Sequence, residues 1–166
     1  MTGLCGWFGP LNRECHPSTV LNAMLVPLGS TEPAQSLSSG AYALGAYSPF
    51  KLASCYEAEG LLTAIDGRVT WDDATLTQLA LQHSGAEVLH AAYRRWGRGC
   101  LTHMHGPFAM AILEPGADTV LLAIDRLGIQ RMCFAPHSGG LVFGSTCDSV
   151  TAHPAIARRI SAQGIF

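Results

Sequence analysis

The sequence predicts an α+β fold in which helices and antiparallel sheets form layers. Strand-like segments occupy the first and last thirds of the 166 residues, whereas helical patterns occupy the middle. This order is not the strand–helix alternation that builds a parallel sheet. A hydrophobic content of 48% with 13% charged residues is typical of a compact globular chain, and the length suits one domain with a substantial core.

The first third begins with a strand expected over residues 3–9. A helix over residues 19–26 follows, because Ser or Thr can cap its start and Pro27 ends it. Residues 28–39 are rich in Gly, Ser, Pro and Thr, which predicts a loop. Three strand-like runs come next, at residues 41–47, 52–56 and 61–69.

The middle of the chain is expected to be helical. Asp72-Asp73 suits the start of a first helix, which apolar residues at positions 76, 79 and 80 continue. A second helix carries an apolar stripe from Val88 to Trp96 and ends at Gly97. The last third returns to strands, at residues 108–113, 120–124, 132–135 and 141–143.

Charge and hydropathy exclude several function classes. A net charge of −2 gives no electrostatic case for binding nucleic acid or an anionic membrane surface. No apolar run approaches the roughly 20 residues that span a bilayer. The amino terminus lacks the basic and long apolar regions of a secretory signal, so a cytoplasmic location is expected.

Cysteine and histidine patterns give no metal site. The six cysteines are widely spaced without a CxxC pair, which in a reducing compartment predicts free buried or half-buried thiols rather than a disulfide framework or zinc site. His103 and His105 offer two metal ligands, but no carboxylate or thiol lies at a recognised zinc spacing. A solvated pair at a strand end is expected there, with no metal.

The segment Cys5-Gly6-Trp7-Phe8-Gly9 carries the strongest chemical signal. A terminal cysteine can use its own backbone amine as general base. Residues 1–4 would have to be removed before Cys5 could react in this way. The structural alternative is a small buried cysteine on a core strand. Thr2 would be terminal after loss of Met1 and is capable of the same attack.

Three further segments complete a pattern, at residues 106–111 (GPFAMA), 121–129 (LLAIDRLGI) and 139–145 (GGLVFGS). With Cys5-Gly6 they resemble class II (amino-terminal-nucleophile) glutamine amidotransferases, and specifically the glutaminase domain of asparagine synthetases. That family begins Cys-Gly-Ile-x-Gly and has a Gly-x-Phe-Ala-Phe-Ala strand, an Arg-Asp-x-Leu-Gly-Ile turn and a Gly-Gly-Leu-x-Phe-Ala-Ser hairpin. Asp125 to Ile129 is the most specific piece, and the resemblance covers essentially the whole chain.

The resemblance implies a four-layer αββα sandwich of two antiparallel sheets, the Ntn-hydrolase-like fold. It also implies that residues 1–166 form a single glutaminase-type domain, the amino-terminal part of a longer asparagine synthetase-like ligase of asparagine biosynthesis. An ATP-dependent synthetase domain, carboxy-terminal or separate, is the expected partner and the expected site of ATP and Mg. No cofactor is expected in this domain. Residues 158–166 remain amphipathic without a stop signal, as expected for a piece of a longer chain.

By the same resemblance Cys5 is the nucleophile that attacks glutamine, and the backbone N–H of Gly67 is one oxyanion donor. Asp66 stands where the family has an oxyanion-stabilising Asn, and an ionised carboxylate only accepts hydrogen bonds. Arg68 replaces a Glu, and its spacing predicts an ion pair with Asp66. Gly85 stands where an Asp would hold the substrate's amino group.

The loop at residues 27–33 also lacks the Arg that would bind the glutamine carboxylate. These departures predict a degenerate glutamine pocket and leave two hypotheses open. One is an amidotransferase that hydrolyses glutamine to supply ammonia for amide transfer. The other is an inactive domain that supports an adenylating synthetase or cyclase domain, as in β-lactam synthetase-like and lasso-cyclase-like relatives. An unrelated α+β binding module is a third interpretation.

Overall fold

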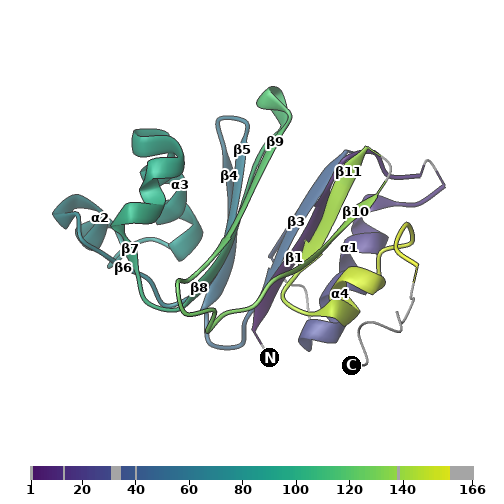
Figure 1. Cartoon of the computed structure of the whole chain (residues 1–166), viewed down its shortest axis with the longest axis horizontal. Helices are drawn as coiled ribbons and strands as arrows, with labels where there is room; N and C mark the ends of the chain where they lie inside the picture. Colours follow the sequence, from purple (N-terminus) through teal and green to yellow (C-terminus); the bar gives the residue numbers. More distant parts are fainter. Residues whose placement is uncertain (1, 13, 31–34, 40, 138, 158–166) are drawn as a thin grey trace.

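Two antiparallel sheets packed face to face form the centre of the molecule, and helices cover both outer faces (Figure 1). The computed structural model describes residues 2–12, 14–30, 35–39, 41–137 and 139–157. The α+β class and the layered sandwich expected from the sequence are confirmed. Among the described residues, no helix is long and apolar enough to cross a membrane. The amphipathic segment at residues 158–166 lies outside the described part of the chain.

Sheet A contains five strands in the order β10-β11-β1-β3-β2. Their bounds are β1 Gly3–Phe8, β2 Gln35–Ser39, β3 Tyr42–Tyr47, β10 Cys133–His137 and β11 Gly140–Gly144. Its outer face is covered by α1 and α4, which span Pro17–Leu25 and Cys147–Thr151, and η1 (Val26–Leu28) extends α1. The first strand therefore lies at the centre of its sheet, paired on both sides.

Sheet B contains four strands in the order β4-β5-β8-β9. Their bounds are β4 Ala53–Ala58, β5 Leu61–Gly67, β8 Phe108–Glu114 and β9 Thr119–Ile124. The helices α2 (Ala74–Leu79) and α3 (Gly85–Trp96) lie on its outer side (Figure 1). The remaining elements are β6 Thr70–Trp71, η2 Gly97–His103, β7 Met104–His105 and η3 Pro115–Ala117.

Strand alternation assigns each side chain of β1 and β5 to one layer. Leu4 on β1 and Leu62 on β5 belong to the apolar cluster between the two sheets. Cys5 belongs instead to the cluster between sheet A and its helices, and Ile65 to the cluster beneath α3. Since successive side chains of a strand point to opposite faces, even-numbered residues of both strands face the space between the sheets.

Local differences from the sequence expectation have physical causes. The first helix begins at Pro17 rather than at residue 19, because proline is tolerated in the first turn of a helix. Residues 28–39 were expected to form a loop, but Gln35–Ser39 forms the edge strand β2, paired with β3. The third expected strand, at residues 61–69, ends at Gly67, where the backbone φ is 131°.

Candidate functional site

The two sheets meet in a polar contact between Thr2 and Asp66. The Thr2 hydroxyl donates to Asp66 Oδ2 across 3.5 Å, although the two residues are 64 positions apart. Asp66 ends the buried part of β5 and is 1% exposed. Both residues have even numbers, so strand alternation directs them into the space between the sheets.

Cys5 occupies the opposite face of β1. It is fully buried beneath α1 and α4, and it pairs in register with Gly144 on one side and Gly45 on the other. Burial raises the pKa of its thiol to about 12, outweighing a hydrogen bond with the Ser149 side chain. Since the thiolate is the reactive form of cysteine, this thiol is not activated for attack.

At the positions expected to stabilise an oxyanion, Asp66 and Gly67 offer no free hydrogen-bond donor. The backbone N–H of Gly67 donates to the Leu52 carbonyl at 2.9 Å. Burial raises the pKa of the Asp66 carboxyl, while the Thr2 hydroxyl lowers it by a smaller amount. Among the described residues, Asp66 Oδ1 has no hydrogen-bond partner.

The expected ion pair between Arg68 and Asp66 is wrong. Salt bridges between described residues include none that joins these two side chains. Arg68 follows the end of β5 and lines a small hollow beside Trp71 and His83 on the α3 side. Alternation alone would place residues 66 and 68 on the same face, but β5 ends at Gly67, whose positive φ turns the chain before Arg68.

Gly85 lies at the start of α3, where the sequence pattern Ser84-x-x-Glu87 forms a capping box. The Ser84 side chain accepts from the Glu87 N–H, and the Glu87 carboxylate accepts from the Ser84 N–H at 2.8 Å. A Cβ built on Gly85 would lie 2.9 Å from Ile65 Cγ2 and 3.8 Å from Ser54 Oγ. An acidic side chain here would therefore need Ile65 to move.

A polar cavity of about 1120 Å³ opens beside Gly85. Its walls include Tyr47, which pairs with Gly3, and Ala53, which pairs with Asp66. The cavity therefore adjoins the end of the sandwich where Thr2 meets Asp66. Lys51 and His83 also line the cavity. Lys51 therefore supplies a cation there, although the loop at residues 27–33 lacks the arginine that the resemblance implies.

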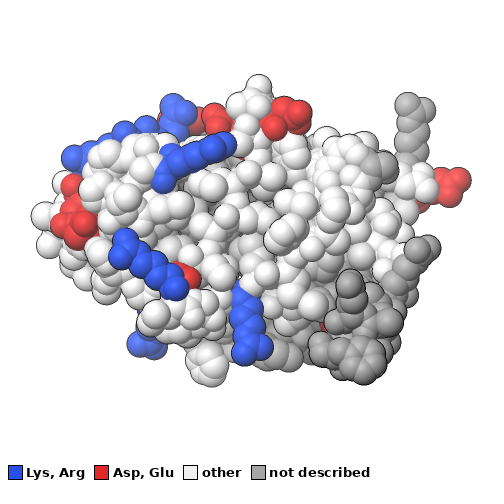
Figure 2. Space-filling model, viewed as in Figure 1, with Lys and Arg blue, Asp and Glu red and all other residues white. Residues whose placement is uncertain are grey.

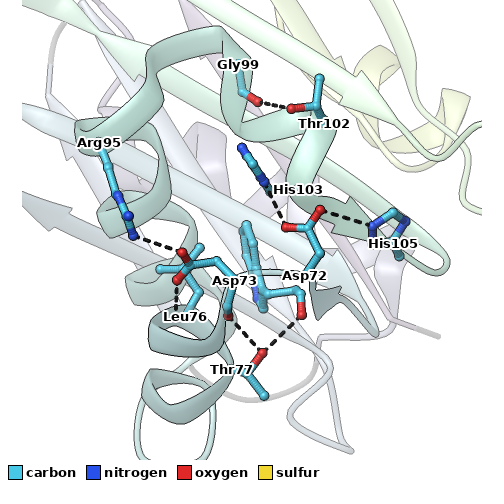
Figure 3. Close-up of polar contacts among 10 residues, drawn as sticks. Asp72, Asp73, Leu76, Thr77, Arg95, Gly99, Thr102, His103 and His105 are labelled. Carbon is cyan, nitrogen blue, oxygen red and sulfur yellow. Dashed lines mark hydrogen bonds and ion pairs between the residues drawn. The ribbon is translucent and has the colours of Figure 1, made fainter.

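His103 and His105 lie elsewhere, at the β6–β7 edge, and both face the carboxylate of Asp72 (Figure 3). The distances are 2.8 Å from His103 Nδ1 to Oδ1 and 3.7 Å from His105 Nε2 to Oδ2. The His103 ring stacks on Trp96 with centroids 4.2 Å apart. Within the described ranges, no cluster of three or more His, Cys, Asp or Glu side chains could hold a metal ion.

Comparison with known proteins identifies the fold's family. The profile of the glutamine amidotransferase domain family matches residues 74–166, more than half of the chain. This chain belongs to the glutamine amidotransferase domain family. The chain is similar to an asparagine synthetase. Over 82 residues it is 32% identical to asparagine synthetase [glutamine-hydrolyzing] 3 of Bacillus subtilis.

A second relative is the amidase chry2 of Gibberella zeae, 24% identical over 101 residues. The two alignments cover 49% and 58% of this chain. They cover only 13% of the Bacillus protein and 15% of the Gibberella protein, so this amidotransferase domain corresponds to a small part of each relative.

The family's Cys-Gly-Ile-x-Gly start fits this amidotransferase domain in a second register. Residues 2–6 read Thr-Gly-Leu-Cys-Gly, which matches both glycines and the aliphatic position and places Thr2 where the family has its cysteine. This register agrees with the contact between Thr2 and Asp66. In the register that starts at Cys5, Thr2 falls outside the family motif, so that register gives Thr2 no role. The two registers differ in the face of β1 that carries the nucleophile position. Thr2 has an even number, as Leu4 does, and even-numbered residues face the space between the sheets, whereas Cys5 faces the helices.

Proposed function

We propose that this chain is a non-catalytic glutaminase-type domain, which serves as the structural partner of an ATP-dependent synthetase domain. The single observation that supports this most strongly is the pairing of Thr2 with Asp66. In the family register, a thiol nucleophile and an amide donor are replaced by an alcohol that donates to a carboxylate. An ionised Asp66 repels a developing oxyanion instead of stabilising it.

Three other features support loss of glutamine hydrolysis. Cys5 is on the helix-covered face of β1, the Gly67 N–H is already bonded to Leu52, and Gly85 offers no carboxylate to a substrate amine. Removing one oxyanion donor alone typically costs about 10²–10³ in rate. Each missing charge-assisted substrate contact costs a further ~1.5–3 kcal/mol of binding.

An exposed apolar surface supports the partner half of the proposal. Four exposed large apolar residues fall within the edge strand β9, the turn after it and β10: Ile124, Leu127, Ile129 and Phe134. Leu127 is 84% exposed. Figure 2 shows that charged side chains concentrate toward the α2 and α3 side, while the surface over the sheets carries few. We take these exposed apolar residues, which are close along the chain, as the candidate interaction surface.

ATP and Mg would be bound by the synthetase domain and not by this chain. The names of the two relatives, a glutamine-hydrolysing asparagine synthetase and an amidase, place their chemistry at amide bonds. We infer that the partner of this domain makes an amide with an amine that does not come from free glutamine.

Glutamine turnover by the full chain tests the catalytic half. We expect no glutamate release above background from the wild type, and none from Cys5→Ala. Release that disappears in Cys5→Ala or in Thr2→Ala would overturn the proposal and would identify the nucleophile. Amino-terminal sequencing of the same sample distinguishes a start at Met1, Thr2 or Cys5.

Association with a synthetase domain tests the structural half. Leu127→Asp is expected to weaken binding of the synthetase domain encoded with this chain at least tenfold in a sedimentation or titration experiment. Leu81→Asp is the matched control, because Leu81 is 75% exposed but lies at the cavity beside Gly85. Equal effects of the two substitutions would contradict an interface around Leu127.

A further inference from the structure

We propose that Cys133 and Cys147 form a reversible disulfide when the protein meets a hydroperoxide. The two Sγ atoms are 3.2 Å apart, about 1 Å farther than the roughly 2.05 Å of a disulfide bond. Both thiols are free in the structure. This site lies apart from the Thr2–Asp66 contact and does not depend on the function proposed above.

The fold creates this pair by returning the chain on itself. Cys133 begins β10 and lies opposite Gly144, the last residue of β11. Ser145 and Thr146 then turn the chain, so that Cys147 begins α4 above the start of β10. The two cysteines are 14 positions apart, and their approach is fixed by sheet pairing and by the helix start rather than by a flexible loop.

The remaining cysteines are less suited to oxidation. Cys5 and Cys100 are fully buried, so a dissolved oxidant does not reach either thiol in the folded protein. Cys15 and Cys55 are half-buried, and no sulfur contact joins them to another described cysteine. Cys147 is exposed and is therefore the thiol that a dissolved oxidant reaches first.

The chemistry needs one equivalent of hydroperoxide. The Cys147 thiolate attacks the peroxide oxygen, the O–O bond breaks, and a sulfenic acid forms with release of water or an alcohol. The Cys133 sulfur then attacks the Cys147 sulfur, the S–O bond breaks, and water leaves. The two sulfurs together lose two electrons, which the peroxide accepts, and a dithiol reductant reverses the reaction.

The bond would fix α4 to sheet A. Within the helical layer, α4 already contacts α1 through Ser149, whose hydroxyl donates to the Met24 carbonyl. The Ser149 N–H donates at 3.1 Å to Oγ1 of Thr146, which caps the start of α4. The Ser149 side chain also contacts the Cys5 thiol. A disulfide at the first residue of α4 therefore restricts opening of the helical layer that covers Cys5.

Peptide mapping of the full chain tests the proposal. Hydrogen peroxide is added at one equivalent, remaining thiols are alkylated, and the protein is digested with trypsin. Both cysteines lie in the tryptic peptide of residues 132–158, because the nearest cleavage sites are Arg131 and Arg158. We expect this peptide to lose two hydrogens, to escape alkylation, and to stay joined after chymotrypsin cuts behind Phe143.

Matched variants separate this pair from general thiol oxidation. Cys133→Ser and Cys147→Ser are expected to abolish the crosslink, while Cys15→Ser keeps it. We expect the wild type to gain about 6–12 °C in Tm on oxidation and to lose the gain with dithiothreitol, since closing a loop of about 15 residues contributes about 3 kcal/mol. A stable sulfenic acid at Cys147 without a crosslink, or a crosslink to another cysteine, would overturn the proposal.

Discussion

The Thr2 hydroxyl donates to the Asp66 carboxylate, and this contact joins the residue that precedes β1 of sheet A to the end of β5 in sheet B. In the register that aligns Thr2 with the family's cysteine, the resemblance assigns the nucleophile and an oxyanion donor to these two positions. In this chain the pair is a hydrogen-bonded alcohol and carboxylate. The contact therefore links the two sheets at the positions on which the proposed loss of catalysis rests.

Asp66→Asn is expected to stabilise the protein at neutral pH. Burial raises the pKa of Asp66, so the folded state binds a proton more tightly than the unfolded state does. Stability from this group is therefore present below the unfolded value of 3.8 and is lost as pH rises through the higher folded pKa. An amide can still accept from Thr2 and carries no charge. We expect a gain of about 1 kcal/mol at pH 7.

Urea unfolding at pH 7 and at pH 3.5 measures this difference. The gain should shrink at the lower pH, which lies below the unfolded value of 3.8, because the Asp66 carboxyl is then mostly protonated in both states. Asp118→Asn, at an exposed turn position, is the matched control and should change stability little at either pH. A loss of stability in Asp66→Asn at pH 7 would mean that the charged carboxylate is required by the fold.

Cys5 is expected to resist thiol reagents in the native protein. Its thiol is fully buried with a pKa raised to about 12, whereas Cys147 is exposed. Iodoacetamide added to the reduced protein should label Cys147 within minutes and Cys5 only after denaturation, as read from peptide masses over time. Rapid native labelling of Cys5 would contradict the buried, unactivated thiol.

Much of the fold could be predicted because its signals are local. The capping box at Ser84 and Glu87 starts α3 where the sequence pattern indicates a helix. Asp125 was singled out by its motif, and the structure gives its physical role. Its carboxylate accepts from the backbone N–H groups of Leu127, Ile129 and Gln130, which holds the turn after β9 and lowers its pKa.

The candidate site could be predicted only in part, because it depends on which face of a strand each residue occupies. Asp66, Gly67 and Gly85 were found from their motifs and lie around one end of the sandwich. Thr2 was recognised as capable of attack but lay outside the register that starts at Cys5. A shift of three residues in the motif moves the assigned nucleophile to the other face of β1. The expected Arg68–Asp66 ion pair was wrong because the chain turns at Gly67, and the spacing of the two residues does not reveal that turn.

Gly6→Ala is expected to destabilise the protein by about 3 kcal/mol or more. A Cβ on Gly6 would lie 2.2 Å from the Ala43 carbonyl oxygen, which belongs to the neighbouring strand and cannot rotate away. Gly116→Ala is the control, because a Cβ there meets nothing within 4 Å. Denaturant unfolding, or soluble yield if Gly6→Ala does not fold, measures the contrast. Similar stabilities for the two variants would contradict the tight pairing of β1 with β3.

His153 is expected to make the protein less stable as pH falls from 6.5 toward 4. The ring is buried against Trp7 and His137, with centroid distances of 5.3 and 5.5 Å. Burial, and then the nearby His137, lower its pKa from 6.5 to about 4. Its Nδ1 accepts the Ala155 N–H at 3.2 Å, so a proton on Nδ1 would remove this hydrogen bond.

The sign follows from proton binding. Between pH 6.5 and 4 the unfolded state takes up a proton at this residue while the folded state does not, so acid favours unfolding. Thermal unfolding from pH 7.5 to 4.5 should show a falling Tm in the wild type and a smaller fall in His153→Phe, which keeps an aromatic ring against Trp7. An identical pH slope in both proteins would show that another group controls the acid sensitivity of the α4 layer.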